Sequence, residues 1–338
     1  MKSIRTVCLA ANDVASVYKD FRRAFEGLGI EVITYVDQLP KSRIIQQDTY
    51  NYWGNKLVPK WFRDQYFSPK NKKVRSLYAR VCKLLNDLSV FLQFRKIIRE
   101  ADVIIFFYNS FYEDSRDLEL IKKAGKKVVY IFVGDDARWY YGMKQDFLLN
   151  GLDAYDYGDD YDYSVDGLLH RIRKIRSAEK FADVVFSKRE QSQLQIRGFY
   201  HYPMVVHPDD YLPDYRQREK CPKVVHAPSN PSIKGTAHVL AAFERLRQEG
   251  VEFVPVLIQN MPHSEAKRVY QDADIVIDQL FIPGAGKLAS EAMAMGKVVL
   301  GRMAYDKYQQ GFPIEDCPIV DAGAHTGYVT LTRIIGDY

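Results

Sequence analysis

Apolar and polar positions along the chain predict alternating strands and helices. Short, continuous apolar runs are separated by segments in which apolar residues recur every three or four positions. The predicted strands span 5–10, 30–36, 101–108, 126–133, 181–187, 223–227, 251–258, 274–280 and 297–300, and the clearest helices span 13–29, 118–125, 236–250 and 264–273. Continuously apolar strands are typical of parallel sheets that helices cover on both faces, so the pattern predicts an α/β fold.

The alternation is interrupted once, by a segment rich in Pro, Asp and Arg. Residues 207–222 read HPDDYLPDYRQREKCP and show no periodicity, which is typical of an interdomain linker. We therefore expect a Rossmann-like N-terminal domain at 1–206 and a second one at 223–338, facing a cleft. Ligands of such sheets bind beyond the carboxyl ends of the strands. Pro255 lies inside a predicted strand, which favours an edge or bulge position there.

Composition limits the class of protein. The 338 residues are 47% apolar and 27% charged, which is typical of a globular chain. Neither the apolar run of a signal peptide nor a run of about 20 apolar residues occurs, so we expect a cytoplasmic protein. The four cysteines are scattered and lack the spacing of a zinc site or a disulfide framework.

Positive charge is concentrated between residues 41 and 100. This basic insertion holds 14 Lys or Arg against 4 Asp or Glu, in a chain of net charge +5. Apolar residues recur through it from Val74 to Ile98, with basic residues around them. The pattern suits a helix that lies on anionic lipid, where each basic residue contributes about 1 kcal/mol; the alternative is a core-facing helix with a solvated basic side. No nucleic-acid module occurs, so nucleic acid is not an expected partner.

Common cofactor and metal motifs are missing. The turn LAANDVAS after the first strand has no glycine, which argues against NAD or FAD, and Leu288 occupies the hydroxyl position of a P-loop aligned on Gly286. The acidic run at 153–167 lacks the ligand spacing of a calcium loop. Two D-x-D triplets, at 160–162 and 272–274, do not follow apolar strands. We expect no metal and no bound cofactor.

Two strand-to-helix turns in the C-terminal domain are compatible with a diphosphate. In HAPSNPSIKGT, Lys234 precedes a helix whose free N–H groups attract anions, although a plain turn with an exposed lysine is the alternative. In FIPGAGKLASEAMAMGK, Gly284 and Gly286 leave backbone N–H groups unobstructed, and Glu291 follows about one helical turn later. A carboxylate there can accept the hydroxyls of a ribose. The alternative for this stretch is a close-packed helix of small residues.

The segment DIVIDQLFIPGAGKLASEAMAMGKVVL resembles the signature of the "group 1" family of retaining, nucleotide-sugar-dependent glycosyltransferases with the GT-B architecture. The match includes the loop glycines and the run Glu291-Ala-Met-Ala-Met-Gly296, and the likeness extends over 223–302. It implies a GT-B fold and metal-independent transfer with retention of configuration. It also implies that Lys234 and the loop 284–287 bind the diphosphate and that Glu291 binds the ribose.

Three positions depart from the family pattern. Pro283 stands where the family has its first acid, Ser229 where it has a phosphate-binding arginine, and Val133 where the N-terminal segment often has histidine. Lys287, in the loop, is the candidate to restore the cationic charge that is missing at Ser229. With Pro283 in the acid position, the candidate catalytic carboxylates are Asp135 and Asp136, in VVYIFVGDDARW, which resembles a segment of the family's N-terminal domain.

The predicted function is that of a hexosyltransferase-like enzyme of surface polysaccharide or glycan synthesis. Its donor would be a nucleoside-diphosphate sugar, and its acceptor a saccharide or a lipid-linked saccharide at the inner face of the membrane. A nucleotide-sugar epimerase and a non-catalytic nucleotide-sugar-binding protein are the alternatives. The chain ends soon after the helix-like GYVTLTRII, where the family usually has a helix that crosses back, so we expect a short protein or a truncated chain.

Overall fold

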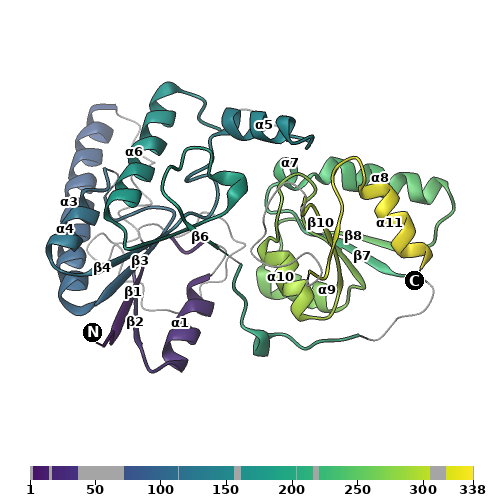
Figure 1. Cartoon of the computed structure of the whole chain (residues 1–338), viewed down its shortest axis with the longest axis horizontal. Helices are drawn as coiled ribbons and strands as arrows, with labels where there is room; N and C mark the ends of the chain where they lie inside the picture. The colour runs from purple at the N-terminus through teal and green to yellow at the C-terminus, as the bar shows by residue number, and fades with distance from the viewer. Residues whose placement is uncertain are drawn as a thin grey trace. The chain divides into compact units, whose positions relative to one another are not determined.

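The computed structural model describes residues 3–14, 17–36, 72–112, 114–155, 161–202, 204–215, 221–304 and 317–337. The chain forms two compact units, and Figure 1 shows a helix-flanked sheet in each of them. The first unit comprises 1–41, 47–136 and 173–186, and the second comprises 42–46, 137–172 and 187–338. The predicted linker at 207–222 falls between the last strand of one sheet and the first strand of the other. The second unit nevertheless begins before this segment, because residues 137–172 and 187–206 belong to it.

The first sheet has six strands in the order β2-β1-β3-β4-β5-β6. The strands are β1 (Thr6–Ala11), β2 (Glu31–Thr34), β3 (Val103–Phe107), β4 (Lys127–Ile131), β5 (Val184–Ser187) and β6 (Tyr200–His201). The helices that lie between β1 and β5 in sequence are α1 (Val17–Gly27), α3 (Lys72–Glu100), α4 (Arg116–Lys123), α5 (Tyr140–Leu149) and α6 (Val165–Phe181). Of these, α5 and the start of α6 belong to the second unit. The pairs from β2 through β5 are parallel, which confirms the expected α/β architecture.

The second sheet has five strands in the order β11-β10-β9-β7-β8, and its pairs are parallel. The strands are β7 (Lys223–His226), β8 (Val254–Leu257), β9 (Ile275–Ile277), β10 (Val298–Gly301) and β11 (Ile319–Asp321). The helices are α7 (Pro231–Lys234), α8 (Thr236–Gln248), α9 (His263–Gln271), α10 (Lys287–Ala294) and α11 (Gly327–Gly336). Pro255 lies in β8 at the edge of this sheet, as predicted, because a proline has no N–H to donate to a second neighbour.

Helices cover both faces of the second sheet. Val225 and Val276 point to one side and pack in a cluster with Ala289 and Ala292 of α10. Their neighbours in sequence point to the other side, where Val224 and the flanking isoleucines of β9 pack with residues of α8 and α11. Because side chains alternate along a strand, a continuous apolar run fills both cores at once.

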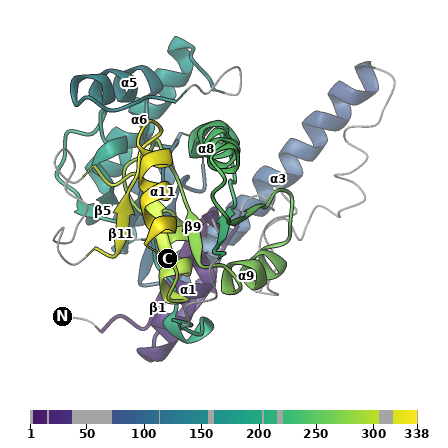
Figure 2. The same ribbon diagram turned by 90° about the vertical axis from the view of Figure 1, so that its right-hand side faces the viewer.

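The basic insertion is described only from residue 72 onward, where α3 begins; residues 41–71 lie outside the described part. Figure 2 shows α3 as one long helix. Val90, Phe94 and Ile97 are buried in the first unit. A second set of apolar side chains on this helix is exposed, and it consists of Leu84, Leu88, Phe91 and Leu92. Among the described residues, no helix is long and apolar enough to cross a membrane.

Candidate functional site

The carboxyl ends of β7 and β9 are joined by a buried histidine. The Nδ1 atom of His226 lies 2.9 Å from the carbonyl oxygen of Ile277, and its Nε2 atom lies 2.9 Å from the hydroxyl of Thr236 at the start of α8. Burial lowers the pKa of His226, which favours a neutral ring with one donor and one acceptor nitrogen. The ring therefore holds together the two strand ends from which both predicted phosphate turns begin.

The turn after β7 is shaped by a cap and a glycine. The side chain of Asn230 accepts the N–H groups of Ser232 and Ile233 at 3.1 and 3.2 Å, which starts the short helix α7. Gly235 ends that helix with φ at +76°, and a Cβ there would lie 3.1 Å from the Cβ of Leu280. The cap at Asn230 and the turn at Gly235 together fix the direction of Lys234. Ser229 is exposed on the same turn.

Lys234 reaches across to the strand β9 and the loop after it. Its ammonium donates to Asp278 Oδ1 at 2.7 Å and to Gln279 Oε1 at 2.8 Å. The other oxygen of Asp278 accepts the N–H of Gly286 at 2.7 Å. The Asp278 side chain is 2% exposed and that of Lys234 is 14% exposed. One buried carboxylate thus connects the two turns that the sequence predicted as parts of a diphosphate site.

The glycine loop is held close to the sheet, and the prediction that Gly284 and Gly286 leave their N–H groups open to an anion is wrong, because both groups are bonded within the protein. The N–H of Gly284 donates to the carbonyl of Arg302 at 2.8 Å, and the amide of Gln279 donates to the carbonyl of Gly284 at 2.7 Å. A Cβ on Gly286 would lie 2.6 Å from Asp278 Oδ2 and 2.9 Å from the ammonium of Lys234. Gly286 has a φ of −83°, so space and not backbone strain requires glycine there.

Glu291 is buried on α10 with two partners that the sequence did not reveal. Its carboxylate accepts the hydroxyl of Tyr211 at 3.1 Å and lies 2.9 Å from Nε2 of His263. Tyr211 comes from the segment predicted as a linker, and His263 opens α9. No sequence motif marks either residue, and only their distance from Glu291 in space identifies them. The acid is therefore positioned by three parts of the second unit.

The ammonium of Lys287 contacts a segment that precedes the predicted linker. Its Nζ donates to the carbonyl oxygen of Val205 at 2.6 Å. The role proposed for it in replacing charge at Ser229 stays a prediction. The second unit therefore contains six candidates, which are Ser229, Lys234, Gly284, Gly286, Lys287 and Glu291. Lys234 and Gly286 meet through Asp278, whereas Glu291 lies in its own contact group.

Asp135 and Asp136 belong to the first unit. Asp136 is buried and accepts the N–H groups of Val133 and Gly134 at 3.1 and 2.8 Å, so it stabilises the turn after β4. Burial raises the pKa of Asp136 to about 6, against the opposing effect of Lys174. Asp135 is only partly buried. A carboxyl group that titrates near neutral pH is a reasonable acid–base candidate, and the same contacts also give Asp136 a structural role.

Metal-ligating side chains do not gather in the described part of the chain. Across those residues, no group of three or more His, Cys, Asp or Glu could hold a metal ion. Asp160, from the first D-x-D triplet, lies outside the described residues. In the second triplet, Asp272 pairs with the ammonium of Lys223, and Asp274 accepts the N–H of Lys223. The absence of a metal and of a bound cofactor stays a prediction.

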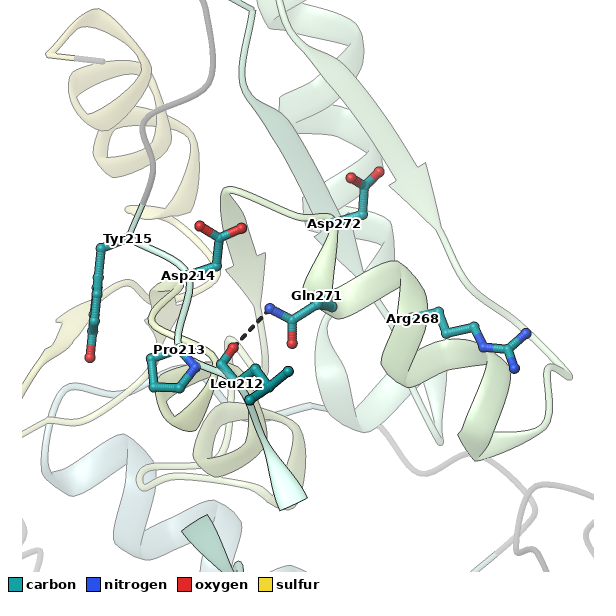
Figure 3. A pocket seen from close by; sticks show the side chains of 7 residues that line it. All are labelled: Leu212, Pro213, Asp214, Tyr215, Arg268, Gln271 and Asp272. Carbon is teal, nitrogen blue, oxygen red and sulfur yellow. Dashed lines mark hydrogen bonds between the residues drawn. The ribbon is translucent and has the colours of Figure 1, made fainter. Parts of the chain in front are cut away.

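The pocket in Figure 3 lies away from these residues. Its volume is about 860 Å³, and it is lined by Leu212, Pro213, Asp214, Tyr215, Arg268, Gln271 and Asp272. The amide of Gln271 closes one side by donating to the carbonyl of Leu212 at 2.9 Å. The pocket adjoins the end of α9, just before β9 begins, and is therefore at the amino-terminal edge of the sheet. Ligands of such sheets bind at the opposite edge, so this pocket is not our candidate site.

Comparisons with known proteins identify the class of fold. No protein-family model matches the sequence, and no curated protein matches it. An alpha-glucosyltransferase solved in complex with UDP and a 13-mer DNA containing a central A:G mismatch is similar in structure, with a TM-score of 0.56 and 12% identity over 99% of this chain and 90% of that chain. The sucrose-phosphate synthase of Thermosynechococcus elongatus gives a TM-score of 0.53 and 12% identity over 98% and 90%.

A third similar structure is the catalytic domain of starch synthase IV from Arabidopsis thaliana, bound to ADP and acarbose. Its TM-score is 0.51, with 14% identity over 100% of this chain and 92% of that chain. All three matches extend over nearly the whole chain at low identity, so what they establish is the fold. The chain has two Rossmann-like domains with parallel sheets, and this is the fold of the GT-B glycosyltransferases.

Proposed function

We propose that this protein is a glycosyltransferase that takes a sugar from a nucleoside-diphosphate sugar. The second unit would bind the donor: Lys234 and the loop 284–287 the diphosphate, Glu291 the ribose. Ser229, at the position of the family's arginine, would contribute its hydroxyl. The fold supports this assignment because it is shared with enzymes that use nucleotide sugars, and the signature resemblance falls on the same residues.

One contact carries the proposal. Asp278 binds the ammonium of Lys234 with one oxygen and the N–H of Gly286 with the other, at the carboxyl ends of adjacent strands. Lys234 and Gly286, which are 52 residues apart in sequence, are thereby bonded to one carboxylate. The alternative for 226–236 was a plain strand-to-helix turn with an exposed lysine. That alternative does not explain why Lys234 is only 14% exposed and bonded to Asp278, which also holds the glycine loop. Cations and helix N-termini in this position stabilise a departing diphosphate.

The chemistry that we propose is transfer with retention of configuration and without a metal. Positive side chains and backbone dipoles would stabilise the charge on the leaving diphosphate, which is the task of a metal in other transferases. The acceptor hydroxyl would attack on the face from which the diphosphate leaves. Asp136, or Asp135 beside it, is the proposed catalytic carboxylate, since Pro283 supplies none. Hexosyl transfer in surface polysaccharide or glycan synthesis is the proposed setting.

The proposed acceptor is a saccharide or lipid-linked saccharide at an anionic membrane surface. The support is the exposed side of α3, where Leu84, Leu88 and Phe91 are spaced at four and three residues and form one stripe. The guanidinium of Arg95 lies 5.8 Å from the centre of the Phe91 ring, on the same stripe. A helix with exposed apolar residues and adjacent basic ones binds the headgroup region of anionic bilayers.

The test is a thermal-shift screen of the full chain against UDP, GDP, ADP, CMP and their sugars. A ligand that binds only the folded state raises Tm by mass action, and at 100 times its Kd it stabilises by about 2.7 kcal/mol. We expect one nucleoside diphosphate and its sugar to raise Tm. Hydrolysis or transfer with that sugar would separate an enzyme from a binding protein, and turnover without an acceptor would indicate the epimerase. A chain that binds none of these ligands would refute the proposal.

A further inference from the structure

The imidazole of His263 lies against the carboxylate that we assign to the ribose. Its Nε2 atom is 2.9 Å from Glu291 Oε1 and 3.1 Å from Glu291 Oε2. The side chain of His263 is 36% exposed and that of Glu291 only 2%, while Tyr211, the other side chain bonded to the acid, is buried. Of these two partners of Glu291, His263 is therefore the one that solvent, and a ligand arriving from solvent, can reach.

The contact with Glu291 fixes the role of each ring nitrogen. A carboxylate only accepts hydrogen bonds, so Nε2 of His263 carries the hydrogen in this contact. In a neutral imidazole the other nitrogen, Nδ1, is then an acceptor. The residues that the structure describes form no hydrogen bond to this Nδ1 atom. The ring thus presents an unused acceptor beside a buried carboxylate.

Both residues lie at the edge of the sheet where ligands bind. His263 is the first residue of α9, which follows β8, and Glu291 lies in α10, which follows β9. Each helix therefore begins at the carboxyl end of a strand in the same parallel sheet, and Ala266 of α9 and Ala289 of α10 belong to one core cluster. The unused nitrogen of His263 is consequently placed beyond the strand ends, where such sheets bind ligands.

The acceptor capacity of Glu291 is largely used within the protein. Each carboxylate oxygen has about two lone-pair sites. Oε1 accepts both the hydroxyl of Tyr211 and the Nε2 hydrogen of His263, which leaves Oε2 as the oxygen that can accept from a ligand. A ribose has two neighbouring hydroxyl groups, and each of them donates one hydrogen bond. One hydroxyl is matched by Oε2, and the other needs a second acceptor close by.

We propose that His263 is a second ribose-binding residue, whose Nδ1 atom accepts one ribose hydroxyl while Glu291 Oε2 accepts the other. This inference rests on the proposed function, because it assigns a further residue to the site proposed for the ribose of the donor. Nε2 stays bonded to Glu291, so the acid binds the ligand and also orients the imidazole. His263 and Glu291 together then select a donor whose ribose carries both hydroxyls.

The experiment is calorimetric titration of the full chain with a nucleoside diphosphate and with its 2′-deoxy and 3′-deoxy forms. The base is the one that binds the unmodified protein most tightly. We expect the unmodified protein to bind the ribose form about three- to tenfold more tightly than either deoxy form, as loss of one hydrogen bond predicts. His263→Gln keeps an amide donor for Glu291 but has no acceptor in place of Nδ1. In this variant one of the two ratios should fall to about one, and the other should remain.

The matched control is His325→Gln. Nε2 of His325 also lies 2.9 Å from a carboxylate oxygen, that of Asp153, but this pair is not part of the contact group of Glu291. Both ratios should stay as they are in the unmodified protein. Circular dichroism would confirm that each variant is folded, and His263→Ala provides a second variant if His263→Gln is unfolded.

Three results would contradict the proposal in different ways. If both ratios are unchanged in a folded His263 variant, His263 only holds Glu291 and does not bind the ribose. If both ratios fall in His263→Gln, the residue acts by positioning Glu291, which likewise overturns the direct contact. An unmodified protein that binds no nucleoside diphosphate would instead overturn the proposed function.

Discussion

The ammonium of Lys234 and the carboxylate of Asp278 form a buried ion pair with an N–O distance of 2.7 Å. Because the same carboxylate accepts the N–H of Gly286, its removal would leave both a buried charge and a buried donor without their partner. We expect Asp278→Ala to lower the free energy of unfolding by about 3 kcal/mol. Urea unfolding of Asp278→Ala, Lys234→Met and the double variant measures these changes in the free energy of unfolding.

The double variant should lose roughly 1–2 kcal/mol less stability than the two single variants lose together, because the second change removes the charge that the first leaves unpaired. The exposed pair Lys123 and Glu119 on α4 serves as a control, with an N–O distance of 2.8 Å. We expect no measurable coupling there, since solvent screens exposed pairs. Strict additivity at Lys234 and Asp278 would contradict the assignment of a coupled pair.

The space around Gly286 predicts a steric effect. An alanine Cβ there would approach Asp278 Oδ2 to 2.6 Å, closer than nonbonded atoms tolerate, so the loop or the carboxylate must move. We expect Gly286→Ala to cost about 1–3 kcal/mol of stability and to weaken binding of the nucleoside diphosphate. The control is Gly198→Ala, where a Cβ would meet nothing within 4 Å. Equal Tm values for the two variants would show that the loop adapts without cost.

The contacts of Glu291 predict a specific preference for ribonucleotides. If its carboxylate accepts the ribose hydroxyls, the unmodified protein should bind a ribonucleoside diphosphate about tenfold more tightly than the 2′-deoxy form. Glu291→Gln should reduce that ratio toward one. Tyr211→Phe removes one donor that positions the same carboxylate, so it should also reduce the ratio, but by less than Glu291→Gln. A ratio unchanged by Glu291→Gln, measured by calorimetry, would exclude the ribose assignment.

The buried carboxyl groups of the first unit predict how stability depends on pH. Burial raises the pKa of Asp136 and that of Asp117 to about 6, from the usual aspartate value of about 3.9. Between the pKa of the unfolded state and that of the folded state, the folded state binds more protons than the unfolded state. Each group therefore makes the free energy of unfolding fall as pH rises from about 4 to about 6. Asn imitates the protonated form of the carboxyl group. Asp136→Asn should therefore flatten the dependence of the free energy of unfolding on pH, and its loss of stability relative to the unmodified protein should be smallest above pH 6.

Urea unfolding of the unmodified protein, Asp136→Asn and Asp117→Asn at several pH values checks this expectation. The difference between each variant and the unmodified protein isolates one group. A difference that does not vary with pH would show that the replaced carboxyl has the same pKa in both states. Turnover of Asp136→Asn with a donor and acceptor gives the separate catalytic test, and a proposed acid–base role predicts a loss of about 10²–10⁴-fold.

The exposed stripe on α3 predicts binding to anionic vesicles. Leu88 and Phe91 are 50% and 44% exposed, and burial of such a side chain in lipid is worth about 1.5–3 kcal/mol. We expect the chain to sediment with phosphatidylglycerol vesicles at low salt and less with phosphatidylcholine vesicles. Leu88→Gln and Phe91→Gln should each reduce binding about tenfold.

Leu149→Gln is the matched control for these changes, because Leu149 is 86% exposed but lies on α5. It should leave vesicle binding as it is. Equal vesicle binding by the unmodified protein and the α3 variants would refute the proposed binding of α3 to a membrane. The proposed donor site does not depend on that result.

The parts of the fold that depend on neighbours in sequence could be predicted from the sequence. Strands β3, β4, β7 and β9 were foreseen because each is a continuous apolar run, and a run of this kind fills both cores of a covered sheet. The edge position of Pro255 followed from its missing N–H. Strand β6 has only two residues, and so short a segment has no periodicity to detect.

The sequence by itself determined the α/β class, the two glycine- and lysine-bearing turns and the position of Glu291, because these depend on local spacing. Only the tertiary structure decided which side chains meet there. Lys234 and Asp278 are 44 residues apart, and Tyr211 and Glu291 are 80 apart. Contacts over such distances depend on how strands, loops and helices pack in three dimensions, and local spacing does not specify which side chains then come within hydrogen-bond distance.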